Sequence, residues 1–118
     1  MKIIYANKRL EAICTDSKAT LHFFGDRNLA RSLRSRLDAI ELAACLRDVI
    51  AMPQFRFHNL EGKLKGLFAI DVKTRRDKWR LLLQPLGDDM RPFDPCHIDK
   101  VASVCKIIEI MELSPHYE

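Results

Sequence analysis

The chain has 118 residues, enough for one domain over residues 1–118 with a modest core that needs neither disulfides nor a metal ion. Its formal net charge of +4 and isoelectric point near 9.0 favour an anionic partner such as nucleic acid, although an ordinary solvated basic surface also explains them. No apolar run approaches the length of a membrane span, and the N-terminal sequence MKIIYANKRL turns charged before a signal-peptide core develops. We therefore expect a cytoplasmic protein with reduced thiols.

The first quarter of the chain predicts a short strand followed by two helices. Residues 2–6 form the strand, and Asn7 caps a helix that runs to about Thr15. Asp16 caps a further turn or two, which Gly25 ends.

Asp26 begins a longer helix with a pronounced apolar stripe, formed by Leu29, Leu33 and Leu37. Asp38 followed by Glu41 resembles a capping box, so we expect a new helix or a kink at that point. Pro53 helps to end the helical region.

The second half of the chain is strand-like. Apolar alternation predicts strands at residues 55–60, 66–73 and 79–85, and a final strand at residues 104–113. A loop over residues 85–95 and a single helical turn within residues 97–104 separate them. Helices followed by strands indicate an α+β fold, with the helices packed on one face of a mostly antiparallel sheet of about four to five strands.

Alternation also assigns the two faces of the strand at residues 79–85. Trp79, Leu81 and Leu83 share one side, which we expect to be the core, while Arg80 lies on the other. A charged residue in a buried strand is costly unless it is paired or faces a groove, so Arg80 is a candidate site residue.

The cysteines do not indicate a metal or redox site. Their positions (Cys14, Cys45, Cys96 and Cys105) contain no C-x-x-C pair, which excludes the usual zinc-ribbon and thioredoxin-like patterns. Cys14 and Cys45 lie among helical apolar residues and are expected to be buried thiols. A metal site built from Cys96, His97 and Cys105 stays open as an alternative, but we expect no metal and no cofactor.

A basic hairpin with a histidine at its base is the strongest functional signal. Residues 58–85 carry seven cations against three carboxylates: Lys63, Lys65, Lys73, Arg75, Arg76, Lys78 and Arg80 against Glu61, Asp71 and Asp77. Histidine suits proton transfer near neutral pH, and arginine can bind two phosphate oxygens at once. Such a hairpin suits a polyanion, including phosphodiester chemistry on RNA.

This segment resembles the HigB-like killer branch of the RelE/ParE toxins of bacterial toxin–antitoxin pairs. The branch pattern is His-x-Leu-x-Gly-x-x-x-Gly-x-Phe-x-Ile/Val-Asp, then a short gap, then an aromatic residue, Arg, Leu, a variable position and Phe, and then a variable position and Pro. It matches His58, Leu60, Gly62, Gly66, Phe68, Ile70, Asp71, Trp79, Arg80, Leu81 and Pro85, while Leu83 stands where the branch has Phe. The resemblance extends upstream through residues 25–53 and downstream to the chain end.

The resemblance implies a ribosome-dependent mRNA endonuclease that cleaves without metal by 2′-OH attack and is inhibited in a hetero-oligomer with a helix-turn-helix antitoxin of the HigA type. It assigns His58 to the active site and Arg80 to the scissile phosphate, with His116 and Tyr117 in the tail. Many relatives end in Asp-Tyr-His or Asp-Thr-His, whereas this chain ends in Ser-Pro-His-Tyr-Glu, with histidine and tyrosine in the opposite order and no preceding aspartate. Many relatives also carry lysine at the position of Glu61, so the general acid stays open. Of the remaining cations, we expect two of four to contact RNA or ribosome: Lys63, Lys65, Arg75 and Arg76.

Two other functions fit the same resemblance. A ParE-like inhibitor of DNA gyrase has the same fold but no nuclease chemistry, and a degenerate toxin would only bind its antitoxin. For the nuclease, we expect His58, Arg80 and the His116/Tyr117 tail to converge on one concave face of the sheet, with Lys63 or Arg75 at the rim.

Overall fold

The computed structural model, which describes residues 1–115, is an α+β fold built on one mixed sheet. Among those residues five strands lie in the order β1-β5-β4-β3-β2, with β1 parallel to β5 and the other pairs antiparallel. Their bounds are Lys2–Tyr5 (β1), His58–Asn59 (β2), Phe68–Asp71 (β3), Arg80–Leu86 (β4) and Ile107–Ser114 (β5). The predicted α+β class and mostly antiparallel sheet are confirmed.

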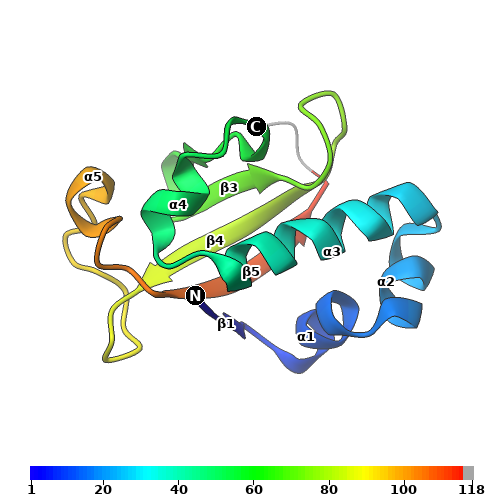
Figure 1. Cartoon of the computed structure of the whole chain (residues 1–118), viewed down its shortest axis with the longest axis horizontal. Coiled ribbons are helices and arrows are strands. Elements are labelled where there is room, and N and C mark those ends of the chain that lie inside the picture. The colour runs from blue at the N-terminus through cyan, green and yellow to red at the C-terminus, as the bar shows by residue number, and fades with distance from the viewer. Residues whose placement is uncertain (116–118) are drawn as a thin grey trace.

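The main helices lie on one side of this sheet. Figure 1 shows α3 and α4 in front of the strands, with α2 beside the N-terminal end of α3 and α1 below α3 in the view. The helices are Lys8–Thr15 (α1), Ser17–Phe24 (α2), Arg27–Leu42 (α3), Leu46–Ile50 (α4) and Ile98–Val101 (α5). Two short 3₁₀ turns, η1 at Pro53–Phe55 and η2 at Gly62–Leu64, flank β2 in the sequence.

Local capping explains where the first helices begin and end. The Asn7 side chain accepts a hydrogen bond from the backbone N–H of Leu10 at 2.8 Å, and Asp16 accepts one from Lys18 at 3.1 Å. Gly25 ends α2 in the left-handed conformation, with φ of 64°, which glycine adopts without steric cost. The predicted boundaries of α1 and α2 are therefore confirmed.

The predicted interruption of the third helix is wrong. Helix α3 continues through Asp38 and Glu41 to Leu42, because Leu37 and Ile40 keep the apolar stripe in the core across that point. Asp38 accepts a hydrogen bond from Arg34 at 2.9 Å instead of capping a new helix.

The strand predicted at residues 55–60 is also mostly absent. Phe55 ends η1 and is buried in the core, and Arg56 adopts a left-handed backbone, with φ of 48° and ψ of 52°. A left-handed residue interrupts extended chain, so pairing with β3 begins only at His58.

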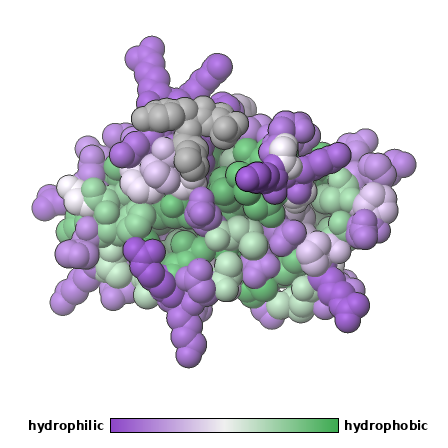
Figure 2. Space-filling model, turned by 180° about the vertical axis from the view of Figure 1, so that it is seen from behind, coloured by the Kyte–Doolittle hydropathy of each residue, from purple (hydrophilic) through white to green (hydrophobic). Residues whose placement is uncertain are grey.

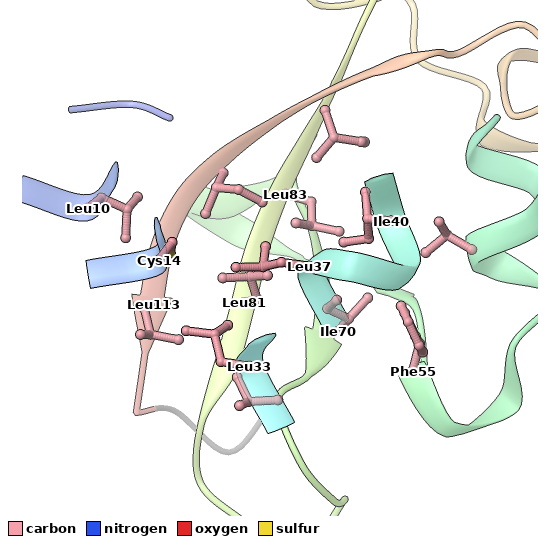
Figure 3. Close-up of a cluster of buried hydrophobic side chains, with 14 of the residues drawn as sticks. Leu10, Cys14, Leu33, Leu37, Ile40, Phe55, Ile70, Leu81, Leu83 and Leu113 are labelled. Carbon is pink, nitrogen blue, oxygen red and sulfur yellow. The ribbon is translucent and has the colours of Figure 1, made fainter. Parts of the chain in front are cut away.

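Apolar side chains from α3 and the sheet form the core, shown in Figure 3. Leu33, Leu37 and Ile40 of α3 are completely buried, as are Ile70 of β3 and the β4 residues Leu81 and Leu83, which confirms the side predicted for the last two. The residues labelled in that view are Leu10, Cys14, Leu33, Leu37, Ile40, Phe55, Ile70, Leu81, Leu83 and Leu113.

A β-bulge in β5 changes which of its residues face the core. Leu82 pairs with Glu112, but Leu83 pairs with Ile110, so Met111 has no partner in the register. The extra residue brings Leu113 to the helix side with Ile110 and turns Ser114 to the other side.

The face away from the helices carries a smaller apolar cluster. Leu60, Ala69 and Leu82 are buried there, and Leu67 and Met111 pack against them. Figure 2, which views the molecule from behind, shows apolar surface across much of this face between projecting hydrophilic side chains. We call it the open face.

Two further features concern helix hydrophobicity and the cysteines. No helix within residues 1–115 is long and apolar enough to cross a membrane. Cys14 and Cys45 are buried as predicted, and Cys105 is also buried, whereas Cys96 is half-buried.

Candidate functional site

Three buried polar residues lie side by side across the open face of the sheet. Asp71 of β3 pairs in register with Arg80 of β4, which pairs with Ser114 of β5. They are only 2%, 2% and 1% exposed, respectively, in a sheet whose other fully buried positions are apolar. Buried polar groups of this kind are expensive unless they are paired, so each requires a partner or a function.

The β3–β4 loop encloses the Arg80 guanidinium. Its Nη1 donates to the backbone carbonyls of Asp77 and Trp79, and its Nη2 donates to the carbonyl of Arg75 at 3.0 Å. Its Nε lies 3.1 Å from Asp71 Oδ1, an ion pair that lacks the geometry of a hydrogen bond. Arg80 therefore holds the loop against the sheet, and its donors are directed into the protein.

Arg56 is the second cation on Asp71. Its Nε lies 3.0 Å from Oδ2 of Asp71, and its Nη2 lies 3.0 Å from Oδ1. Both carboxylate oxygens are thus used, one by Arg56 alone and the other by Arg56 and Arg80 together. A buried carboxylate between two guanidiniums leaves an excess of positive charge at this place.

Arg36 of α3 brings a third guanidinium to the same end of the sheet. It donates to the backbone carbonyls of Asp71 at 2.9 Å, Gln54 at 3.2 Å and Lys73 at 3.0 Å. Its guanidinium carbon lies 4.7 Å from the ring centroid of Phe55. Burial lowers the pKa of Arg36, and the nearby Asp71 carboxylate partly offsets that effect.

The geometry of His58 defines which ring nitrogen carries its proton. Nδ1 lies 2.7 Å from the backbone carbonyl oxygen of Arg56. A carbonyl only accepts hydrogen bonds, so Nδ1 is the donor, and in neutral histidine Nε2 then holds the free lone pair. Nε2 is buried and has no hydrogen-bond partner among residues 1–115. Such a nitrogen suits proton acceptance.

The structure brings His58 and Arg80 to one side of the sheet. His58 pairs with Ala69, and Ala69 and Asp71 are two residues apart in β3, so their side chains share a face. Asp71 connects them, since it binds both Arg80 and the residue whose carbonyl holds His58. The tail residues His116 and Tyr117 lie outside the described residues.

The four cations, of which two are predicted to contact RNA or ribosome, lie in two separate segments of the chain. All four are exposed, but Lys63 and Lys65 lie in the segment that precedes β3, whereas Arg75 and Arg76 lie in the loop that follows it. Only the second pair is next to Arg80, because the Arg75 carbonyl binds its guanidinium.

Sequence reasoning missed Arg56, Arg36 and Ser114 and gave Asp71 no role beyond its place in the motif. A carboxylate at Asp71, in a strand with Ile70 and Val72, is a detectable sign of a buried ion pair. Arg56 lies between two phenylalanines, which is a weaker sign. The role of Ser114 depends on the bulge in β5, which alternation alone does not reveal.

A hollow of about 600 Å³ lies elsewhere on the protein, lined by parts of residues 59–68, 84–85 and 92–99. Its charged lining residues are Lys65 against Glu61, Asp94 and Asp99, so it carries a net negative charge that disfavours RNA. Neither His58 nor Arg80 lines it.

Comparison of the sequence with models of known protein families gives no match, and comparison with curated proteins gives none either.

Proposed function

We propose that this protein is a HigB-like toxin of the RelE/ParE group that cleaves mRNA on the ribosome without a metal ion. The observation that carries the proposal is the environment of His58. Its Nδ1 is committed to a backbone carbonyl, its Nε2 is without a partner among residues 1–115, and a cluster of arginines with one buried carboxylate adjoins it. The sequence resemblance supports the same assignment.

The proposed reaction is transesterification of RNA by its own 2′-hydroxyl. His58 Nε2 accepts the hydroxyl proton, the 2′-oxygen bonds to phosphorus, and the bond from phosphorus to the 5′-oxygen breaks. The products are a 2′,3′-cyclic phosphate and a 5′-hydroxyl, whose oxygen receives a proton from a general acid that we leave unassigned. The arginines supply positive potential for the charge that develops on the phosphorane-like transition state.

Substrate access requires part of the site to rearrange, because both His58 Nε2 and the Arg80 guanidinium are buried. Arg80 is buried by the β3–β4 loop, and the loop also carries the exposed Arg75 and Arg76. We propose that these two exposed cations meet the RNA backbone first. Arg80 reaches a phosphate only after its contacts with the loop carbonyls break.

A second candidate function is antitoxin binding without catalysis. The observation that favours it is the same enclosure of Arg80, whose Nη1 and Nη2 groups already bind carbonyls. A helix-turn-helix antitoxin remains the proposed partner in both cases.

The test is induced expression without an antitoxin, followed by mapping of mRNA ends and a gyrase supercoiling assay. New ends inside translated codons, lost in His58→Gln but kept in His22→Gln, support the nuclease. His22 is an exposed histidine of α2 and serves as the matched control. Intact transcripts with blocked supercoiling would instead indicate a gyrase inhibitor, and intact transcripts with normal supercoiling would indicate the binding-only protein.

His58→Gln is a sharper test than Arg80→Ala. By analogy with loss of one electrostatic donor, Arg80→Ala should cost about a hundredfold or more in cleavage rate. Because Arg80 also holds the β3–β4 loop, the same change affects folding, and its rate must be measured where the variant is shown to be folded.

A further inference from the structure

Asp71 is an unusual place for a carboxylate, because it lies inside the sheet and not at its surface. It is almost completely buried, and both of its oxygens contact the guanidinium of Arg56. A buried ion pair rarely gives more stability than apolar packing would, so stability alone does not explain the Asp71–Arg56 pair. The pair therefore suggests a role in holding another group in position.

Arg56 has an unfavourable backbone conformation. Its φ of 48° and ψ of 52° place it in the left-handed region, which residues with a Cβ rarely adopt. Its backbone N–H donates to the Pro53 carbonyl at 3.1 Å, and its side chain reaches Asp71. These contacts at both ends of the residue stabilise a conformation that arginine would otherwise avoid.

The left-handed conformation directs the Arg56 carbonyl at His58. The carbonyl oxygen lies 2.7 Å from Nδ1, and an extended Arg56 would point that oxygen elsewhere. In free neutral histidine the proton prefers Nε2, so the tautomer with the proton on Nδ1 must be imposed by its surroundings.

We infer that Asp71 is a positioning residue, which fixes the tautomer and orientation of His58 through the side chain and backbone of Arg56. The contacts run from the Asp71 carboxylate to the Arg56 guanidinium, and from the Arg56 carbonyl to His58 Nδ1. They leave Nε2 as the nitrogen with the lone pair. The catalytic meaning of this arrangement rests on the proposed nuclease function, whereas the arrangement itself does not.

The test is the ¹⁵N NMR spectrum of the histidine side chains, at a pH where His58 is neutral. The chain has four histidines, and the His58→Gln variant assigns the signals of His58. In the native protein we expect the Nδ1–H tautomer to be in clear excess, because only Nδ1–H can donate to the Arg56 carbonyl. Asp71→Asn should reduce that excess to near parity. The control Asp38→Asn, which breaks an exposed pair with Arg34, should leave it unchanged.

Two variants at Arg56 test the backbone step and remain informative if Asp71→Asn does not fold. Arg56→Gly and Arg56→Ala both remove the contact with Asp71, but glycine adopts the left-handed conformation readily and alanine does not. We therefore expect more of the Nδ1–H tautomer in Arg56→Gly than in Arg56→Ala. Equal populations in the two would overturn the backbone step.

Cleavage assays separate this inference from the proposed function. If the protein is a nuclease, Asp71→Asn should lower kcat by about twofold with little change in KM, because about half of the His58 side chains then carry the proton on Nε2 while the RNA-binding cations are untouched. Loss of the Nδ1–H tautomer in Asp71→Asn, in a protein that never cleaves RNA, would support the positioning role and reject the nuclease. A native His58 with its proton on Nε2, or an unchanged tautomer in Asp71→Asn, would overturn the inference whatever the activity.

Discussion

Replacing Arg80 by methionine tests whether the buried ion pair holds the β3–β4 loop. The change keeps an unbranched apolar stem but removes the Asp71 contact and three hydrogen bonds to loop carbonyls. Breaking a buried pair costs about 3–5 kcal/mol, because the remaining charge loses its partner. Asp71 keeps Arg56, and the freed carbonyls can bind water, so we expect about 3 kcal/mol.

The assay is urea unfolding followed by circular dichroism, because the only tryptophan is adjacent to the mutated residue. Asp38→Asn is the control: it breaks the ion pair with Arg34, and both side chains are at least 41% exposed. An exposed pair is worth about 0–1 kcal/mol. A loss below about 1 kcal/mol for Arg80→Met, equal to the control, would refute the reasoning.

A double-variant cycle isolates the pair itself. Asp71→Leu combined with Arg80→Met replaces both charges by apolar groups, which is often far less damaging than removing one. We expect the double variant to be more stable than the sum of the single losses predicts, by about 1–3 kcal/mol. Strict additivity would mean that the two side chains do not depend on one another.

Three smaller predictions concern other parts of the molecule. Burial raises the pKa of the Cys14 thiol from 9.0 to about 11, so the neutral thiol stabilises the fold fully below pH 9, and this contribution is lost between pH 9 and 11. The free energy of unfolding should therefore fall by about 3 kcal/mol over that range, and by less in Cys14→Ala. Cys96 is the only one of the four cysteines that is not buried, so a thiol reagent should label it first in the native protein, and Cys96→Ser should remove that fast phase. Asp26 accepts hydrogen bonds from the backbone N–H groups of Asn28 and Leu29 at the start of α3. Asp26→Ala should lower the free energy of unfolding, measured in urea, by about 1 kcal/mol, and a loss near zero would contradict the capping role of Asp26.

The sequence predicts best those features that short stretches of chain determine. Asn7, Asp16 and Gly25 act on backbone groups a few residues away, so their effects on α1 and α2 are visible in the sequence. Alternation likewise gives the face of β4 on which Arg80 lies, because strand periodicity is local.

Features that depend on contacts between distant parts of the chain cannot be predicted from the local sequence. Asp38 has the spacing of a helix cap, but burial of Leu37 and Ile40 against the sheet carries the helix past it. The enclosure of Arg80 depends on how the β3–β4 loop folds back, and nothing in the local sequence fixes that path.

Arg56 shows the limit most clearly. Arginine carries none of the signals of a left-handed residue, which are typical of glycine and asparagine. Its conformation is stabilised by a carboxylate 15 residues further along the chain, across the sheet, so only the folded structure reveals it. The sequence pattern identifies His58 as a candidate, whereas only the structure identifies the Arg56 carbonyl that orients it.

Asp71 contacts both Arg56 and Arg80, and this matters for how the β3–β4 loop would open to admit a substrate. If a phosphate drew Arg80 away from the loop, Asp71 would keep Arg56, which contacts both carboxylate oxygens through Nε and Nη2. Removing Arg80 leaves the attraction between Arg56 and Asp71 unchanged and removes the repulsion between the two guanidiniums that share Oδ1. Release of Arg80 would therefore leave Arg56 more firmly held, and the carbonyl that orients His58 would stay in place. Opening the loop and keeping the histidine aligned are then compatible, which a site with a single arginine on Asp71 would not allow.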